Sequence, residues 1–256
     1  MVKSKSNLWV ALAAPLLLGI ASCSKDDDGM PTDPQTQAKL SAVAVESGSS
    51  SSSSARVEVS GFAVSQFSVG TQDVDMKYYA EADLTAGISL GDLQLKSAVN
   101  AGLQSSSSSK KSVVLISNGE SKFGVIGEGG TPEGNYTEVA FKLYKSTESN
   151  ANDPMYQKSL LITGEINGKL AQVWTESEKS IRASSKSSTG VDVSENTEMV
   201  LQFELDKLFA GVNMGTALDA NGDGRIEIGP NSPDGNAAIL AKIESNLETA
   251  VSLNKR

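Results

Sequence analysis

The chain has 256 residues and a formal charge of −9, with no histidine and a single cysteine. The absence of histidine excludes Ser-His-Asp and Cys-His catalysis and any histidine metal ligand. One cysteine can form neither an intrachain disulfide nor a zinc site built from several thiolates. The acidic balance argues against a nucleic-acid partner, because nucleic-acid binding requires a basic face.

The first 22 residues have the composition of a secretory signal peptide. Lys3 and Lys5 supply its positive start, and an apolar run follows from Leu8 to Ile20. This run is shorter than the ~20 residues of a membrane-spanning helix, so no transmembrane anchor is predicted. Residues 18–23 (LGIASC) resemble the lipobox of bacterial lipoproteins. The resemblance implies that Cys23 becomes the first residue and carries a covalent lipid such as palmitate; the alternative is an ordinary signal peptide with an incidental cysteine.

The residues after Cys23 predict where the anchored chain is displayed. Residues 24–28 (SKDDD) resemble the acidic export tag of Bacteroidota-type surface lipoproteins. The resemblance implies a lipid-anchored protein of the outer membrane that faces the cell exterior. The alternative is a solvated, acidic start of a linker. Removal of residues 1–22 takes away two lysines and no acids, which leaves a body with a charge of about −11.

Residues 23–55 are predicted to form a disordered tether that is acidic at its start and serine-rich at its end. Pro31 and Pro34 disfavour a helix, and residues 49–54 are consecutive serines. Serine runs bury little surface, so the tracts at 105–109 and 184–188 are predicted to be loops. Residues 56–256 are predicted to form one domain.

Short runs of alternating apolar and polar residues predict many β-strands in this domain. The clearest alternation places Met199, Leu201, Phe203 and Leu205 on one face, against Gln202, Glu204 and Asp206. Between two other runs, Asn167-Gly168 predicts a tight hairpin, because both residues tolerate positive φ. Many short strands with turns between them predict a mostly β domain, an antiparallel β-sandwich.

One helix is predicted, at the C-terminal end. From about residue 236 to residue 253, Ile239, Ile243, Leu247 and Ala250 recur at helical spacing. Lys255 and Arg256 follow the predicted helix, near its C-terminal end, where positive charges are favoured. An apolar face of this kind most often packs on its own sheet.

The segment DANGDGRIEIGP, residues 219–230, matches the start of a calcium loop. Such a loop supplies oxygen ligands from its first, third and fifth positions and a backbone carbonyl from its seventh, with glycine at the sixth for the sharp turn. The predicted ligand set here is Asp219, Asn221, Asp223, the backbone of Arg225, and Glu227 at the ninth position.

The twelfth position departs from the calcium-loop pattern. It is Pro230, where a bidentate glutamate is expected, and Asn231 or Asp234 would have to reach the ion instead. The alternative is that Asn-Gly-Asp-Gly simply makes a tight turn. A calcium ion bound here is predicted to be structural and weakly held, with a Kd of about 10⁻⁴–10⁻³ M, as in extracellular modules.

The sequence offers little for catalysis. Paired carboxylates can hydrolyse glycosides, but no spacing singles out a pair among the available residues, which are Glu128, Glu133, Glu138, Glu176 and Glu178. No catalytic residue is therefore assigned. Five aromatic residues are candidates for a carbohydrate platform, although such residues more often complete a core: Trp174, Tyr78, Tyr79, Tyr144 and Tyr156.

Residues 132–139 (PEGNYTEV) resemble the Pro-x-Gly-x-Tyr segment of a bacterial lipoprotein family of unknown function. The resemblance extends over about residues 56–208. It implies a transthyretin-like or immunoglobulin-like sandwich and carries no catalytic residues. The residues themselves predict that Pro132 and Gly134 turn the chain and that the Tyr136 hydroxyl reaches backbone across a sheet corner.

These observations predict a non-enzymatic surface lipoprotein that serves as a binding or accessory module. Its partners would be the membrane, through the lipid on Cys23, and a surface glycan or a protein. A structural or envelope-assembly lipoprotein without a ligand is the alternative, and a carboxylate-based hydrolase is a remote one.

Overall fold

The computed structural model describes residues 34–46, 57–80, 99–102 and 110–256. Contacts along the chain divide it into two units, Met1–Thr32 and Asp33–Arg256. The predicted signal peptide, Cys23 and the acidic tag lie outside the described residues, as do the serine tracts at 49–54 and 105–109. The second unit is the folded body and is described by itself.

The prediction of a mostly β domain is confirmed. Over the described residues the strands join into one 15-stranded mixed sheet, whose main order is β14-β10-β9-β3-β8-β11-β15-β13-β1-β7. The strands are β1 (Gln35–Val45), β2 (Glu58–Val59), β3 (Phe62–Ala80), β4 (Val99–Gly102), β5 (Lys111–Ser117), β6 (Glu120–Ser121), β7 (Gly124–Pro132), β8 (Gly134–Leu143), β9 (Leu160–Ile166), β10 (Lys169–Thr175), β11 (Ser180–Ser185), β12 (Val191–Val193), β13 (Glu198–Glu204), β14 (Arg225–Ile228) and β15 (Val251–Lys255).

The alternation in the sequence predicted purely antiparallel strand pairing, but the sheet is mixed. Parallel pairs join β1 to β13, β10 to β14 and β11 to β15. Parallel partners need long crossover connections, which alternation within single strands does not reveal. An immunoglobulin-like sandwich is not confirmed, because the described strands form one connected sheet.

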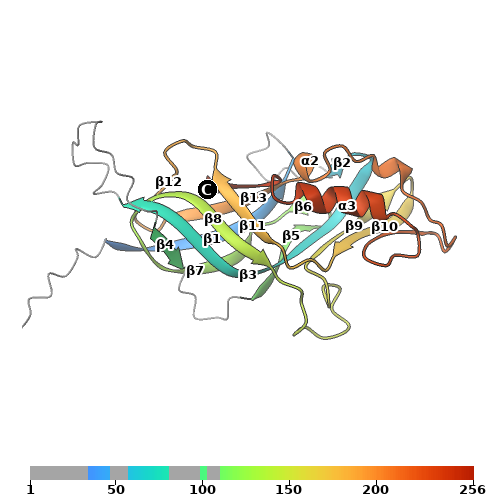
Figure 1. The fold of residues 1–256 in the computed structure, drawn as a ribbon, viewed down its shortest axis with the longest axis horizontal. Coiled ribbons are helices and arrows are strands. Elements are labelled where there is room, and N and C mark those ends of the chain that lie inside the picture. Colours follow the sequence, from blue (N-terminus) through green and yellow to red (C-terminus); the bar gives the residue numbers. More distant parts are fainter. Residues whose placement is uncertain (1–33, 47–56, 81–98, 103–109) are drawn as a thin grey trace, which may run out of the picture. The chain divides into compact units, whose positions relative to one another are not determined.

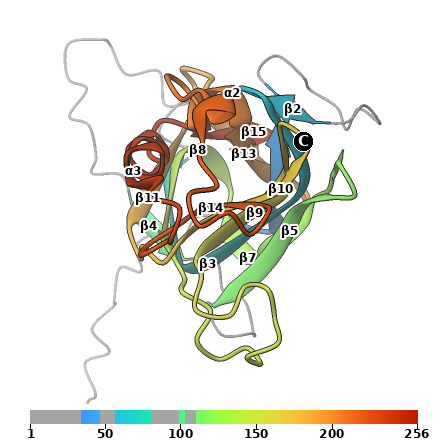
Figure 2. The same cartoon turned by 90° about the vertical axis from the view of Figure 1, so that its right-hand side faces the viewer.

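The long strand β3 organises the sheet by pairing differently along its two halves (Figure 1). Its first half lies between β9 and β5, so that Phe67 is opposite both Ile162 and Ile116. Its second half lies between β8 and β4. Register shifts interrupt these pairings, and such irregularities bend and twist a strand. The sheet therefore curls, and β5 comes to lie beside β7 (Figure 2).

The predicted tether is wrong for residues 35–45, which form the strand β1. This strand lies between β13 and β7 in the sheet. Leu40, Ala42 and Ala44 are fully buried in the main core, while Val43 and Val45 pack with Val200 in a second cluster. The small side chains of this strand give a weak hydrophobic signal between two polar tracts, so composition alone placed it with the tether.

The predicted C-terminal helix is too long. The helix α3 covers Ala237–Asn246, and the chain then turns into strand β15 between β13 and β11. Ile243 and Leu247 are buried as the helical spacing predicted, but Val251 and Leu253 are buried as strand residues. Lys255 therefore ends a strand, with Arg256 directly after it, and neither lies at the end of a helix. Two shorter elements precede α3, the helix α2 (Leu205–Leu208) and the 3-10 turn η1 (Met214–Thr216).

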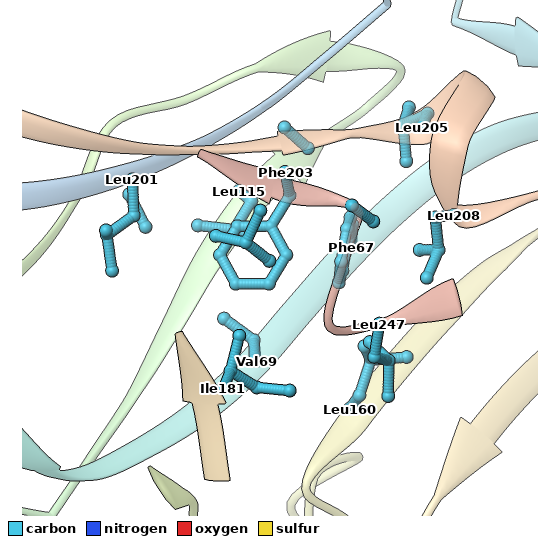
Figure 3. Packing of buried hydrophobic residues seen from close by; sticks show 14 of the residues in the cluster. Phe67, Val69, Leu115, Leu160, Ile181, Leu201, Phe203, Leu205, Leu208 and Leu247 are labelled. Carbon is cyan, nitrogen blue, oxygen red and sulfur yellow. The ribbon is translucent and has the colours of Figure 1, made fainter. Parts of the chain in front are cut away.

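The core fills the space inside the curl and draws on strands that are distant in sequence (Figure 3). Phe203 of β13 contacts the ring of Phe67 of β3 edge-on, with 5.7 Å between centroids, and Phe141 of β8 at 6.2 Å. Each fully buried side chain of this size stabilises the fold by roughly 1.5–3 kcal/mol relative to exposure. Leu205 and Leu208 of α2 close one end of the same cluster.

The predicted corner at Tyr136 is confirmed. Its hydroxyl group donates a hydrogen bond of 2.7 Å to the backbone oxygen of Pro132 and lies 2.7 Å from the Thr131 hydroxyl. The ring is buried and stacks on Tyr78, at a centroid distance of 5.2 Å. This residue therefore ties the β7–β8 turn to β3.

Candidate functional site

The calcium-like segment begins at Asp219, whose side chain is only 3% exposed. Its Oδ2 accepts a hydrogen bond of 3.1 Å from the amide of Gly224 and lies 2.6 Å from the Lys169 ammonium. The hydrogen bond from Lys169 and the positive charge outweigh burial and lower the pKa of Asp219. Its other oxygen, Oδ1, is buried and has no hydrogen-bond partner among the described residues.

Asn221 and Asp223 each form a turn in which the side-chain oxygen accepts a hydrogen bond from the backbone amide two residues further on. Asn221 Oδ1 accepts from the amide of Asp223 at 3.0 Å, and Asp223 Oδ1 accepts from the amide of Arg225 at 2.9 Å. Asn221 Nδ2 also donates to Asp223 Oδ2 at 3.1 Å. Gly222 and Gly224 have φ of +74° and +84°, a left-handed backbone conformation that residues other than glycine rarely adopt.

Glu227, the predicted ninth-position ligand, does not join this group. It lies in β14, and its Oε1 accepts a hydrogen bond of 2.9 Å from Gln172 of the paired strand β10. The parallel pairing of β10 with β14 places Gln172 and Glu227 directly opposite each other, so the carboxylate has a partner on the neighbouring strand. Glu227 was predicted as a ligand from its spacing in the segment alone, and spacing carries no information on strand pairing.

Asp234, and not a residue at the twelfth position, fixes the backbone of the segment. This buried carboxylate accepts hydrogen bonds from the amides of Ala220, Asn221 and Glu227, at 3.0, 3.3 and 2.7 Å. Asn236 also holds the segment, by donating to the backbone oxygens of Leu218 and Glu227. In the sequence, Asp234 was predicted only as an alternative ligand. No sequence pattern indicated that Asn236 holds the backbone of the segment or that Lys169 pairs with Asp219.

The arrangement limits what the segment could hold. Among the described residues, no three His, Cys, Asp or Glu side chains lie close enough together to hold a metal ion. A cation here would have two carboxylates, Asp219 and Asp223, supplemented by the amide oxygen of Asn221 and backbone carbonyls. This is an all-oxygen set of low charge, which suits a hard cation bound weakly.

Two depressions that share lining residues lie over β3 and β9, and the smaller one continues over β10 and β14. They have volumes of about 310 and 180 Å³, and both are lined by Ser65, Gly164 and Leu170. The smaller one extends to Arg225 and Glu227, next to the calcium-like segment. Leu170 is 56% exposed, an apolar side chain among the polar groups of Thr163 and Gln172.

The predicted aromatic platform is not formed by the residues that the structure describes. Tyr78 and Tyr144 are buried. The Trp174 ring packs against Gly229 so closely that a Cβ atom there would lie 2.0 Å from it. The side chain of Tyr79 lies outside the described residues, and Tyr156 is partly buried in a loop. Tyr78, Tyr144 and Trp174 therefore complete the fold.

Three of the carboxylates considered for hydrolysis are in ion pairs. Glu138 pairs with Lys77 and Arg182, Glu176 with Lys145, and Glu178 with Lys142.

Glu204 is the carboxylate whose burial the sequence analysis missed, because alternation placed it on a polar face. Its side chain is 5% exposed, and Oε1 lies 3.0 Å from Lys186 Nζ, Lys207 Nζ and Ser252 Oγ. Burial by itself raises the pKa of Glu204, but the hydrogen bonds from Lys186, Lys207 and Ser252 outweigh it and lower the pKa.

Acidification is expected to destabilise the fold through Glu204. Because its pKa is lower in the folded than in the unfolded chain, its stabilising contribution is complete above the unfolded pKa and is lost as the pH falls through the folded one. Urea denaturation at a series of pH values from about 6 to 2 is expected to show a smaller loss of stability for Glu204→Gln than for the wild type. The exposed Glu58→Gln is the control and should follow the wild type. Equal slopes for all three chains would contradict the role of Glu204.

Comparison with known proteins finds no matching family model, no matching curated protein and no matching solved structure. Among the described residues, no helix has the length and apolar character to cross a membrane.

Proposed function

We propose that this chain is a lipid-anchored lipoprotein of the outer membrane, displayed on the cell surface, and that its β body is a non-catalytic binding module. The observation that carries the proposal is the order of residues 18–28, in which a lipobox is followed directly by an acidic export tag. Acylation of Cys23 holds such a protein at a membrane, because each buried methylene contributes about 0.8 kcal/mol. The resemblance of residues 132–139 to a lipoprotein family supports the same class, and only the lipoprotein class is taken from it.

The position of β1 sets how far the body can lie from its anchor. Since β1 begins at Gln35, the link from Cys23 is much shorter than the tether first predicted to reach residue 55. A chain from residue 23 to residue 34 spans at most about 40 Å, even fully extended. The body is therefore held close to the membrane surface, and its partner would be a molecule found there, a surface glycan or a protein.

The two adjoining depressions are the surface that best suits such a ligand. Ser65, Thr163 and Gln172 offer hydrogen-bonding groups, and the exposed Leu170 offers an apolar contact between them. Ligand sites generally combine apolar contact area with a few convergent polar groups. No catalytic pair is needed for this role.

The anchor is tested by replacing its cysteine. The full chain is expressed in a bacterium with an outer membrane, and the membrane and soluble fractions are compared. The wild type is expected in the membrane fraction and open to protease on intact cells, whereas Cys23→Ala should be soluble. Ser50→Ala, in the serine tract outside the lipobox and the tag, is the control and should behave as the wild type. Retention of Cys23→Ala in the membrane would overturn the anchor, and protection of the wild type from protease would overturn its exterior display.

The binding role is tested with two surface variants. Glycan and protein arrays are probed with the wild type, with Leu170→Asp and with Val114→Asp, which alters an exposed residue of β5 that lines neither depression. A ligand that binds the wild type and Val114→Asp but not Leu170→Asp supports the proposed surface. Binding unaffected by Leu170→Asp would place the site elsewhere. The absence of any ligand would favour the structural alternative.

A further inference from the structure

The two oxygens of Asp219 are in different situations, and this difference points to a cation. Oδ2 is held by the Gly224 amide and the Lys169 ammonium, while Oδ1 is buried without a partner among the described residues. A buried carboxylate oxygen without a hydrogen bond is unfavourable unless another group compensates it. The Gly224 amide donates to Oδ2 across the turn, so the carboxylate is tied to the 219–225 segment while Oδ1 keeps its capacity to accept.

The other side-chain oxygens of the segment also retain capacity for a ligand. Asn221 Oδ1 and Asp223 Oδ1 each accept one backbone amide, at 3.0 and 2.9 Å. A carbonyl or carboxylate oxygen has two lone pairs, so each can also contact a cation. These hydrogen bonds fix the direction of both side chains before any ion arrives.

The chemistry of this set selects the ion. The chain has no histidine, and its one cysteine, Cys23, lies far away in sequence, so the segment offers oxygen alone. Oxygen ligands favour hard cations over zinc or copper. Calcium accepts six to eight oxygens in flexible geometry and takes water for those that are missing, whereas magnesium demands near-ideal octahedral geometry.

We propose that residues 219–225 bind one calcium ion through Asp219 Oδ1, the side-chain oxygens of Asn221 and Asp223, and the backbone carbonyl of Arg225. Water completes the coordination, since Glu227 is held by Gln172 and the twelfth position is Pro230. Two carboxylates and the adjacent Lys169 charge make the site weak, with a Kd of about 10⁻⁴–10⁻³ M. This site does not depend on the proposed lipid anchor, and it adjoins the proposed ligand surface at Arg225, which also lines the smaller depression.

Calorimetric titration of the chelator-treated full chain with calcium chloride tests the site, with magnesium chloride as the comparison ion. The wild type is expected to bind one calcium ion and to bind magnesium at least about tenfold more weakly. Asp219→Asn is expected to weaken calcium binding by more than about tenfold, because it removes a charged ligand. Asp153→Asn is the matched control, since Asp153 Oδ1 accepts the Met155 amide at 2.8 Å in a similar turn outside the segment.

Lys169→Met keeps the proposal testable even if Asp219→Asn fails to fold. Removal of the ammonium group beside Asp219 should strengthen calcium binding by about three- to tenfold, because a positive charge no longer opposes the ion. Calcium should also raise the Tm of the wild type, since an ion that binds only the folded chain stabilises it. No heat and no change in Tm at 5–10 mM calcium, roughly ten times the expected Kd, would overturn the site. Unchanged affinity in Lys169→Met would overturn the assignment to Asp219.

Discussion

Replacement of Phe203 by alanine is expected to lower the free energy of unfolding by about 3–5 kcal/mol. Phe203 is fully buried in β13, and its ring contacts Phe67 of β3 and Phe141 of β8. The alanine variant loses the transfer free energy of the ring and leaves a cavity that the surrounding strands cannot fill. Urea denaturation followed by circular dichroism gives the free energy of unfolding of both chains.

Phe123→Ala is the matched control for this large effect, because it deletes the same atoms at the surface. Phe123 is 37% exposed and lies under the guanidinium group of Arg256, 4.1 Å from its ring centroid. A cation–π contact at an exposed site is worth about 0.5–1 kcal/mol, so this variant should lose no more than about 1 kcal/mol. Equal losses in the two variants would mean that Phe203 is not in the core of the folded chain.

Deletion of residues 1–46 is expected to abolish cooperative folding, because it removes β1. This strand pairs with β13 on one side and β7 on the other, over residues 39–45 and 35–42. Its loss would leave the backbone groups of both neighbours unpaired and would open the core at Leu40, which is fully buried. The expected result is no unfolding transition in urea and rapid cleavage by protease.

Deletion of residues 1–33 is the control, because it ends at the boundary of the folded body and keeps β1 whole. This shorter deletion should retain the unfolding transition of the full chain. A stable body in the absence of residues 1–46 would restore the original prediction of a tether to residue 55. The comparison therefore decides whether β1 is part of the domain.

The strands were predictable where their own side chains carried the signal. Met199, Leu201 and Phe203 lie in β13 with their apolar side chains buried, and Asn167-Gly168 joins β9 to β10 with φ of +51° and +76°. Local conformational preference and alternation are sufficient for such elements. The β1 strand was missed because alanine and serine contribute little to that pattern. Only its pairing with β13 and β7 makes it a strand.

The C-terminal segment shows why helical spacing alone was insufficient. Leu247 and Ala250 continue the apolar spacing of α3 and are buried, yet the helix ends at Asn246. Val251 and Leu253 then pair with β13 and fill the sheet between β13 and β11. Val251 is β-branched, and such a residue gains more from pairing with a neighbouring strand than from one more helical turn.

In the calcium-like segment, the sequence indicated the residues whose geometry is local. The turns at Asn221 and Asp223 depend on neighbours two residues away, so they follow from the order DANGDGR. The contacts of Lys169 with Asp219, and of Gln172 with Glu227, join residues that are far apart in the chain. Such contacts arise from the parallel pairing of β10 with β14, which no local pattern predicts.

The counts of histidine and cysteine were therefore enough to exclude histidine and thiol-pair chemistry. The order of residues 18–28 was enough to propose Cys23 as the anchor, and alternation along the chain was enough to predict a mostly β body. These conclusions depend on composition and on short-range order, which the sequence contains directly. The tertiary structure alone decided that β1 belongs to the body, that the sheet is mixed and curled, and that Glu227 is hydrogen-bonded to Gln172 of the neighbouring strand. Each of these depends on strands meeting partners far along the chain, because backbone pairing and burial are properties of the folded sheet and not of any one segment.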